Sequence, residues 1–546
     1  MASIPNYPGV HLREVPSGTQ TIGGASTSVA AFVGYLPKGP VDEPTRVFSF
    51  AEFSRHFGGL DSDSDTSYAV QQFFLNGGSE AWIVRVASGA EAAGATLVDA
   101  NGVKRLELEA LTPGSWGDEL EVAVYPIEDS EDEVTGFDLV VRQSRPTQTE
   151  DGDKKVLAEE VYRGLSLDED FAARITEESS LVKATEENGD TKTAPVATDD
   201  EGDKIDPQGD VDEPKDDDFQ PFDNGDDGVV PSADWSDDDM SDFISVIEGD
   251  AAASPPTGVY ALSSIAPFTY NILSLPDATH LTNTDGRSGQ DKAKDLYEKV
   301  AKICEDEDAF LLVDPPGDID TTSDMTDWAD KLRKKNAATY FPSLEIADPL
   351  DGHKPRKVGP SGTLAGLYAR IDSSRGIWKA PAGTEAKLRG AEPAKNIDDG
   401  KNGVLNKSGI NVLRTFAGYG PVSWGARTLV GNQEGDNKYV PVRRMTLFLK
   451  KSLELGLKWA VFEPNGEQLW ATIRLTVESF LNRLYRQGAF QGATAKEAYF
   501  VLCDTTTTTP DDINRGIVNV VVGFAPLKPA EFVVVQLQQM AGQAQS

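Results

Sequence analysis

Apolar and polar residues recur with two different periods along this chain, and its first 90 residues show both. Residues 26–40 carry a run of small and β-branched residues closed by a Pro/Gly turn, which predicts a buried strand. Ser49 precedes a short amphipathic stretch that stops at Gly58, as in a capped helix. A second helical stripe ends at Gly77, and residues 81–87 return to a strand pattern. The β–α–α–β order predicts a mixed α/β layer.

Residues 91–185 change to an alternation with period two, which predicts a small antiparallel β unit. We expect residues 91–250 to be an inserted β domain. Strand and helix patterns alternate again over residues 258–375, beginning with a predicted strand at 258–265. This second α/β stretch predicts a partly parallel sheet that shares its core with residues 21–90, in one domain made of 21–90 and 251–375.

Residues 376–546 are predicted to form a C-terminal α/β domain. Its longest helical stripe spans about Glu467 to Gln487, with Arg483 and Arg486 off the apolar face. The domain finishes on an apolar strand pattern at Glu531–Leu537. A strand at a chain end leaves main-chain N–H and C=O groups in need of a partner, and we expect another copy of the protein to supply it.

Residues 1–20 are predicted to be an extended arm. Pro5, Pro8 and Pro16 rule out a helix and disfavour a central strand. Between them, the segment Val10–Val15 alternates apolar and polar side chains. Two interpretations remain open, a frayed terminus and a segment that docks on another sheet as an added strand.

Asp199–Asp239 is the compositional outlier, with eighteen Asp and Glu residues against two Lys. Such a segment predicts a disordered or loosely held acidic loop. A calcium site is a weaker interpretation, because no loop combines the required ligand spacing with a closing Glu. Asp61–Asp65 has the opening spacing, but the sixth-position Gly is missing and Gln72 stands where the bidentate Glu belongs. We therefore predict no metal site.

Length and composition indicate a folded protein of several domains: 546 residues, 58.8 kDa and 39 % apolar residues. The formal net charge of −38 disfavours binding to nucleic acid, which needs clustered Lys and Arg. Two distant cysteines, Cys304 and Cys503, predict neither a disulfide framework nor a zinc site. No apolar run approaches the roughly 18 residues of a membrane span, so we expect assembly in the cytoplasm without membrane insertion.

No catalytic motif is present among the common nucleophile, phosphate-binding, zinc and redox patterns. A Ser/His/Asp site would require the fold to bring His280 beside Asp314 and a serine. Cys503 ends an apolar strand pattern and is better explained as a buried thiol than as a nucleophile. No cofactor is expected. The residues alone leave two kinds of function open, an α/β hydrolase and a non-contractile shell or adhesin protein.

Several local sequences, taken together and in order, resemble the contractile tail sheath family, the outer sleeve of contractile phage tails and of related injection particles. The resemblance spans most of the chain and is strongest after Ser361, whereas the acidic loop is not part of the family pattern. The matching sequences include YPGVHLREVPSG, STSVAAFVGYLPKGP, FAEFSRHFGG, LTPGSWGDELEV, SGTLAGLYARIDSSRGIWKAPAG, GINVLRTF, WAVFEPN, LWATIRLTVESFLNRLYRQGA and PAEFVV.

The resemblance implies a non-enzymatic subunit that assembles with identical copies around an inner tube, between a baseplate and a terminal cap protein. It implies a middle domain of subtilisin-like fold without catalytic activity, and N- and C-terminal arms that add strands to neighbouring subunits. Arg483 and Arg486 would face the tube. Phage tail, tailocin and dedicated injection particle fit equally. The strand-exchange residues would be Val10, Leu12, Glu14, Val15, Glu531, Phe532, Val533, Val534, Val535 and Leu537.

Overall fold

The computed structural model has a mixed α/β architecture with several sheets, as the sequence predicts. It divides into two compact units, which we call the sheet unit and the C-terminal unit. The sheet unit comprises residues 28–374 and 381–440, and the described part of the C-terminal unit comprises 21–27, 375–380 and 441–536. The structure describes residues 21–128, 134–146, 154–168, 170–187, 193–199, 202–232, 235–283, 288–431 and 435–536.

The sheet unit is built on an eight-stranded sheet with the order β18-β17-β13-β12-β11-β1-β3-β2. The six inner strands are parallel, and the two edge strands pair antiparallel with their neighbours. The strands are β1 (Ala30–Gly34), β2 (Thr45–Val47), β3 (Ala81–Arg85), β11 (Ile272–Ser274), β12 (Phe310–Val313), β13 (Ala337–Phe341), β17 (Ile410–Phe416) and β18 (Gly420–Ser423).

Helices cover both faces of this sheet, so β1, β12 and β13 are buried along their whole length. On one face, Phe32 of β1 contacts Phe73 at 5.5 Å between ring centroids, and Phe310 of β12 contacts Tyr368 at 6.4 Å. These contacts place α2 (Asp65–Asn76) and α7 (Ser361–Arg375) there; α1 (Phe50–Phe57) precedes α2. The main hydrophobic core joins the other face to α4 (Asp237–Glu248), η3 (Gly258–Ile265), α5 (Gly289–Asp306), α6 (Thr322–Ala329) and α8 (Asp399–Lys407).

The strand predicted at 258–265 is wrong, because these residues form the 3-10 helix η3. Val259, Leu262 and Ile265 are buried at intervals of three, which is the repeat of a 3-10 helix. A short apolar run does not distinguish the two structures by its period.

Pro342 ends the strand that begins at Ala337, because proline lacks the N–H that a ladder needs. β13 ends at Phe341, and β14 then begins a separate three-stranded sheet with the order β15-β14-β16. Its strands are β14 (Leu344–Asp348), β15 (Lys354–Val358) and β16 (Glu392–Pro393).

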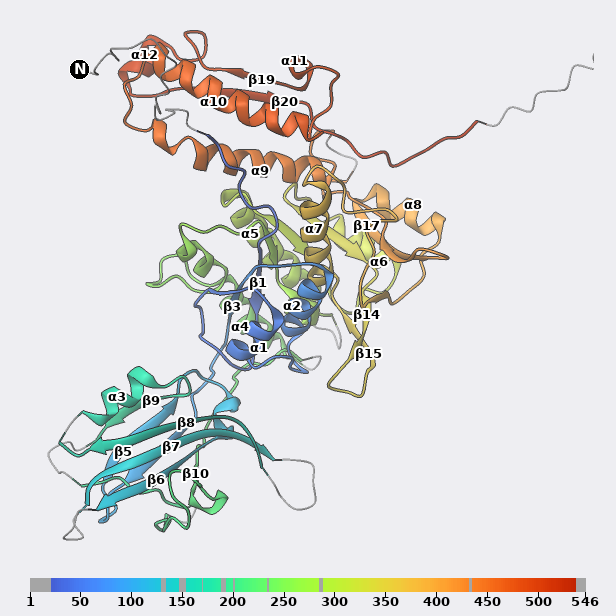
Figure 1. Cartoon of the computed structure of the whole chain (residues 1–546). Helices are drawn as coiled ribbons and strands as arrows, with labels where there is room; N and C mark the ends of the chain where they lie inside the picture. The colour runs from blue at the N-terminus through green and yellow to red at the C-terminus, as the bar shows by residue number, and fades with distance from the viewer. Residues whose placement is uncertain are drawn as a thin grey trace, which may run out of the picture. The chain divides into compact units, whose positions relative to one another are not determined.

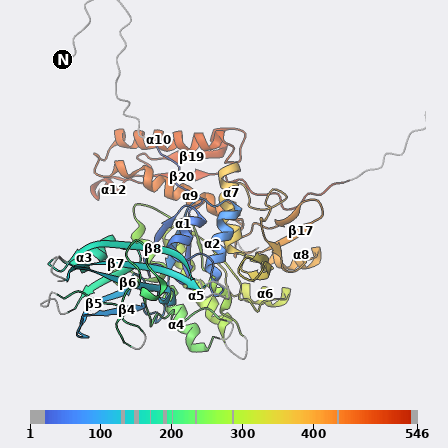
Figure 2. The same ribbon diagram turned by 60° about the horizontal axis from the view of Figure 1, so that its bottom comes forward.

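Between β3 and β11 the chain leaves the eight-stranded sheet and forms two antiparallel sheets with a common hydrophobic core. The sheets have the orders β10-β6-β7-β8 and β4-β5-β9. Figure 2 shows β5 and β4 beneath β6, β7 and β8. The elements are β4 (Gly94–Val98), β5 (Lys104–Ala110), η1 (Ser115–Glu119), β6 (Leu120–Glu128), β7 (Val134–Pro146), β8 (Lys154–Ser166), α3 (Phe171–Glu178), β9 (Val182–Glu186) and β10 (Gln220–Pro221).

The described part of the acidic segment 199–239 is attached to these sheets, unlike the predicted loose loop. β10 pairs with β6, and the fully buried Asp218 closes the short helix η2 (Asp216–Asp218). The Asp218 carboxylate accepts hydrogen bonds at 3.0 Å from the Tyr125 hydroxyl and from the Gly209 N–H. Composition predicts a solvated loop here. It does not reveal that one of the many aspartates, Asp218, is buried and accepts hydrogen bonds from main-chain N–H groups.

The C-terminal unit packs two long helices and a two-stranded sheet around one hydrophobic core (Figure 1). The buried stripe of the second helix is the one predicted from its helical period. It comprises Leu469, Ile473, Val477, Phe480, Leu481 and Leu484. The elements are α9 (Val440–Gly456), η6 (Lys458–Ala460), α10 (Glu467–Arg486), α11 (Ala495–Ala498), β19 (Tyr499–Leu502), α12 (Pro510–Asn514) and β20 (Val521–Phe524).

Two predicted domain limits differ from these units. β17 and β18 lie within the predicted C-terminal domain, yet they extend the eight-stranded sheet. Residues 21–27, predicted to begin the middle domain, belong to the C-terminal unit, where Arg483 donates to the Ile22 carbonyl at 2.8 Å. Local periodicity identifies a strand or helix, but it does not say which sheet the element joins.

Candidate subunit interface

The two-stranded sheet of the C-terminal unit has one exposed apolar face. Phe500, Leu502 and Val521 point to that face and are 52 %, 42 % and 44 % exposed. Phe500 lies over Gly523 of the facing strand, where a Cβ would stand 2.1 Å from the ring. The glycine therefore lets the aromatic ring lie flat on the sheet and keeps this face smooth. Contiguous exposed apolar surface of this kind marks an interaction site.

The opposite face of the same sheet is buried against α10. Val501 and Cys503 are part of the core there, and burial raises the pKa of the Cys503 thiol. This is the buried structural thiol that the sequence predicts, and the other cysteine, Cys304, is also free and buried. One face thus anchors the sheet to its own unit, while the other is available.

Both strands of this sheet also lack a second strand neighbour among the described residues. β19 pairs only with β20, in an antiparallel register that runs from Tyr499 opposite Phe524 to Leu502 opposite Val521. A sheet edge presents a row of main-chain donors and acceptors that can pair with an incoming strand. The sheet therefore offers a free edge and a free apolar face together.

After β20 the chain continues as a segment that leaves the sheet (Figure 1). Residues 531–536 form no strand in the single chain, and Phe532, Val533, Val534 and Val535 are 72–82 % exposed. Four consecutive apolar residues with high β propensity are thus left in solvent. The remaining predicted strand-exchange residues, Val10, Leu12, Glu14, Val15 and Leu537, lie outside the described part of the chain.

The two arginines predicted to face a tube differ in their surroundings. Both are exposed near the end of α10. Arg483 donates to the Ile22 carbonyl and lies 5.4 Å from the Phe480 ring centroid, so it fastens residues 21–27 to the helix. Arg486 makes no hydrogen bond or ion pair with the described residues. Of the two, Arg486 is the one free to meet a partner.

A cluster of buried polar side chains lies at the carboxyl ends of β1 and β11. Asp65 begins α2, and Asp277 and His280 lie in η4 (Pro276–His280). Asp65 accepts a 2.9 Å hydrogen bond from Arg356 and lies 3.3 Å from His280 Nε2. Asp277 accepts from the Thr66 hydroxyl at 2.8 Å. Ligands of parallel α/β sheets often bind at this edge, but here the chain's own side chains fill it.

Burial and close pairing of opposite charges shift the pKa values of the side chains in this cluster. Burial raises the pKa of Asp65, but the neighbouring His280 and Arg356 outweigh it and hold the pKa well below its usual range. The same contact with Asp65 raises the pKa of His280 despite its burial. Burial and the nearby Asp65 charge raise the pKa of Asp277 to about 6. The cluster is thus an internal ion network.

The structure does not assemble the Ser/His/Asp site that the sequence left open. The serine nearest to Asp314 is Ser361, whose N–H donates to the carboxylate at 2.8 Å and whose hydroxyl donates to its second oxygen. Ser274 donates to the Ser361 hydroxyl oxygen at 2.6 Å. Among the described residues, no hydrogen bond joins His280 to a serine hydroxyl. Ser361 therefore has no imidazole to act as its base.

The opening aspartates of the weak calcium pattern also have other roles. Asp61 accepts a 2.9 Å hydrogen bond from the Asp63 N–H, and Asp65 is occupied by Arg356 and His280. In the described ranges, no group of three or more His, Cys, Asp or Glu side chains is arranged to hold a metal ion. A search of the same residues finds no helix long and apolar enough to cross a membrane.

The raised pKa of Asp314 predicts that the free energy of unfolding depends on pH. Burial raises its pKa to about 7, well above the value of an unfolded aspartate, so its contribution is present at low pH and lost as pH rises through 7. Between about pH 5.5 and about pH 8 the loss is on the order of 2 kcal/mol. The Asp314→Asn variant lacks this carboxyl group, so its free energy of unfolding should fall less than that of wild type between the two pH values, by about that amount. Urea unfolding at both pH values measures the difference. An unchanged fall would contradict the assignment.

Comparison with known proteins bears directly on the exposed sheet and segment. A family model described as the phage tail sheath C-terminal domain matches residues 433–540. The tail sheath protein of Vibrio phage KVP40 is 24% identical over 247 residues, 41% of this chain. A putative prophage major tail sheath protein of Pseudomonas aeruginosa is 25% identical over 294 residues, 52% of this chain. The contracted PVC sheath of an extracellular contractile injection system aligns over 98% of the chain, with a TM-score of 0.55 and 19% identity.

Residues 433–540 thus match the phage tail sheath C-terminal domain family, and nearly the whole chain shares the fold of the PVC sheath protein. The sequence alignments cover 35% of the KVP40 protein and 70% of the Pseudomonas protein, and the structural alignment covers 99% of the PVC sheath chain. The part of the chain that matches the family model contains α10, β19, β20 and the segment after β20. The candidate interface thus lies in the matched region.

Sequence patterns do not reveal every exposed side chain of this protein. Phe462, between η6 and α10, is fully exposed, although an aromatic residue within an apolar run predicts burial. The available signal is its position just before Glu463 and Pro464, because a turn there carries side chains outward.

Proposed function

We propose that this chain is the structural subunit of a contractile sheath. Identical copies polymerise as stacked rings or a helix around an inner tube, and the sleeve shortens to drive the tube through a target cell envelope. The observation that carries the proposal is the exposed apolar segment Phe532–Val535 in a unit whose two-stranded sheet has no third strand among the described residues. The match of residues 433–540 to the phage tail sheath C-terminal domain and the fold shared with the PVC sheath support the same assignment.

The linkage between copies is exchange of strands. Residues Glu531–Leu537 of one subunit, and the arm Val10–Val15 of another, add to the C-terminal sheet of their neighbours. In an added strand, Phe532 and Val534 lie on one face and Val533 and Val535 on the other. One pair then covers the exposed face that carries Phe500.

Strand exchange suits a sleeve that changes its length. Its affinity comes from main-chain hydrogen bonds, whereas side chains supply only the pockets and the fit. A flexible connection after β20 lets the rest of the subunit rotate as a rigid body while the paired strands stay together. Contraction then needs no nucleotide, because the subunits are assembled in an extended state of higher energy.

The other partners follow from the same architecture. An inner tube protein lies inside the sleeve, with α10 toward it and Arg486 as the free polar contact. Baseplate and terminal cap proteins bind its two ends. Nucleic acid and membrane insertion play no part, in keeping with a net charge of −38.

The two antiparallel sheets of residues 91–250 form an inserted β domain on the outside of the sleeve. This location suits their acidic, solvated surface, and it leaves the C-terminal unit free to form the inner wall. The sheath assembles in the cytoplasm and becomes part of a virion tail or an injection particle.

Negative-stain microscopy of the purified full-length chain tests the function. We expect hollow sleeves of uniform width at high protein concentration, because a neighbouring copy supplies the third strand that the sheet lacks among the described residues. Light scattering gives the concentration at which sleeves form, and a dilution series shows whether they are reversible. A chain that stays monomeric over the whole range would contradict the proposal.

A further inference from the structure

The connection between α9 and α10 carries an exposed aromatic side chain on a strained turn. Phe462 is fully exposed and has a φ of +70°, in the left-handed region that bulky residues rarely adopt. Its neighbour Val461 is 61 % exposed. Main-chain hydrogen bonds from Val461 to Lys458 and from Glu463 to Ala460, both 3.3 Å, hold the turn. We call residues 458–463 the Phe462 turn.

Charged side chains of opposite sign flank this aromatic ring. Lys458 and Glu463 are exposed, and neither side chain makes an ion pair or hydrogen bond with the described residues. An exposed aromatic residue between two unpaired charges has the composition of an interface anchor, where one large side chain is buried and its charged rim sets the orientation.

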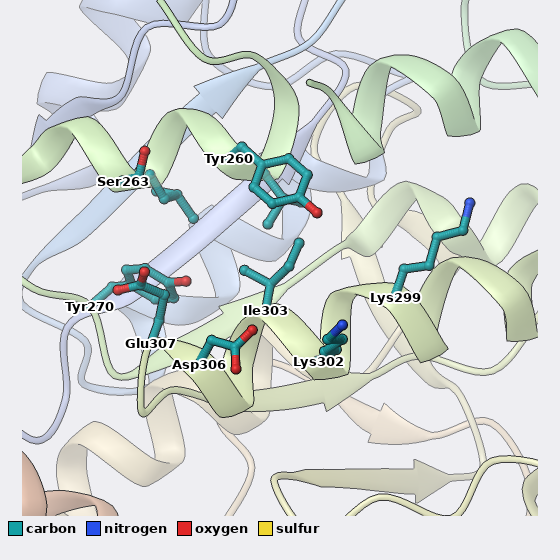
Figure 3. Close-up of a pocket in the computed structure, with 10 residues that line it drawn as sticks. Tyr260, Ser263, Tyr270, Lys299, Lys302, Ile303, Asp306 and Glu307 are labelled. Atoms are coloured by element: carbon teal, nitrogen blue, oxygen red, sulfur yellow. The ribbon is translucent and has the colours of Figure 1, made fainter. Parts of the chain in front are cut away.

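A pocket of about 400 Å³ lies in the sheet unit between η3 and α5 (Figure 3). Val259, Leu262 and Ile303 make its apolar lining, and Tyr260 and Tyr270 flank Ile303 in the view. This volume is ample for a phenyl side chain and lies in the range of ligand pockets.

The hydroxyl of Tyr270 in this pocket lacks a hydrogen-bond acceptor among the described residues. This hydroxyl is buried, and burial raises its pKa well above the usual range. A buried hydroxyl without a partner is destabilising until an acceptor is brought to it. An incoming turn with free main-chain carbonyl groups supplies such an acceptor.

The rim of the pocket has charges that complement those of the Phe462 turn. Lys299 is already paired with Glu248 at 2.6 Å, but Lys302 is exposed and forms no ion pair among the described residues. Asp306 and Glu307 are exposed beyond it at the end of α5. The rim therefore presents one free cation and two carboxylates, matching Glu463 and Lys458.

We propose that the Phe462 turn of one subunit docks in the η3–α5 pocket of a second copy of this chain. Phe462 fills the apolar lining, Glu463 meets Lys302, and Lys458 meets the carboxylates of Asp306 and Glu307. The contact joins two different surfaces, so it repeats from copy to copy instead of closing a dimer. It rests on the proposed sheath function and adds a contact specified by side chains to the exchange of strands.

Cysteine cross-linking between separate copies tests the contact directly. Full-length Phe462→Cys is mixed with full-length Ser263→Cys, whose position lines the pocket, and the mixture is oxidised after assembly. Both native cysteines are buried, so they do not compete. We expect a disulfide-linked dimer in the assembled fraction, because the Cα atoms come within about 7 Å.

The matched control pairs Phe462→Cys with Val404→Cys, an exposed apolar position on α8 outside the pocket. That mixture should give no dimer above the level of Phe462→Cys alone. Equal cross-linking to both positions, or sleeves that form without a Ser263→Cys cross-link, would overturn the contact while leaving the sheath function standing.

A charge swap provides the second test. Lys302→Glu and Glu463→Lys should each raise the concentration needed for sleeve formation about tenfold, the effect of losing one interfacial charge pair. The double variant restores opposite charges and should return close to the wild-type concentration. Lys401→Glu, an exposed lysine on α8, is the control and should change little.

The outcomes separate the two claims. Single variants that assemble like wild type, or a double variant no better than the worse single one, overturn the docking contact only. A wild-type chain that never forms sleeves overturns the sheath function and the contact together.

Discussion

Deletion of residues 530–546 is expected to abolish sleeve formation while leaving the protein folded. The segment Phe532–Val535 is exposed in the single chain and belongs to no hydrophobic core, so its removal exposes little apolar surface. Assembly loses the strand that each subunit gives to its neighbour. Light scattering should report a monomer, and the thermal unfolding midpoint should stay within about 2 °C of wild type, as for a change of under about 0.5 kcal/mol.

Deletion of residues 1–15 should have the same effect, since the N-terminal arm is the second exchanged strand. A matched control keeps the length of the C-terminal segment but changes its backbone. Val533→Pro and Val534→Pro each remove one N–H, and in an edge pairing only alternate N–H groups face the partner. One of the two variants should therefore impair assembly more than the other. Long sleeves from either truncated protein would contradict strand exchange.

Asp65→Ala should be among the most destabilising single substitutions in the sheet unit. Asp65 is the buried carboxylate that faces both Arg356 at 2.9 Å and His280 at 3.3 Å. Its removal takes away the carboxylate nearest to both groups and leaves only the longer contact of Arg356 with Asp348, at 3.8 Å, among the ion pairs of the described residues. Breaking a buried pair in this way costs about 3–5 kcal/mol. Urea unfolding of the full-length protein at neutral pH measures the change.

Asp63→Ala is the control for this prediction. Asp63 is two residues away and exposed, so its loss should change the free energy of unfolding by no more than about 0.5 kcal/mol. Equal effects at the two positions would mean that the ion network around Asp65 contributes little to stability.

Local sequence rules predict much of the secondary structure, because the residues that decide it are close in sequence. Ser49 accepts a hydrogen bond from the Glu52 N–H and Gly58 adopts a left-handed conformation, so α1 begins and ends where its caps predict. At the start of α12, Thr509 and Asp512 form a capping box, an arrangement that also depends only on residues close in sequence. Period-two alternation likewise predicts the antiparallel strands at β5, β6, β7 and β8, but not β4, β9 or β10.

The features that the sequence does not predict depend on contacts between residues that are distant in sequence. β17 pairs with β13 across about seventy intervening positions, and its own period does not reveal which sheet it joins. Asp65, His280 and Arg356 come from three separate segments, and each alone resembles an ordinary surface charge. Asp65 is buried, and the side chains of His280 and Arg356 are only 21 % and 18 % exposed, because β1, β11 and β15 bring those segments together.

The candidate interface also has one part that the local sequence predicts and one part that it does not. The apolar run Glu531–Leu537 is visible in the sequence, and so is its lack of a partner at the chain end. The exposed face around Phe500 is not, because an apolar strand in a two-layer unit predicts burial on at least one side without saying which residues stay exposed. The structure adds that face, with Gly523 beneath the Phe500 ring.

High-resolution electron cryomicroscopy of sleeves formed by the full-length chain tests the central claim most directly. The account predicts density for residues 532–535 as a strand beside β19 or β20 of a neighbouring subunit, with apolar side chains against Phe500. Density in which this segment instead folds back on its own sheet, or lies unpaired while the sleeve is held by other contacts, would contradict it.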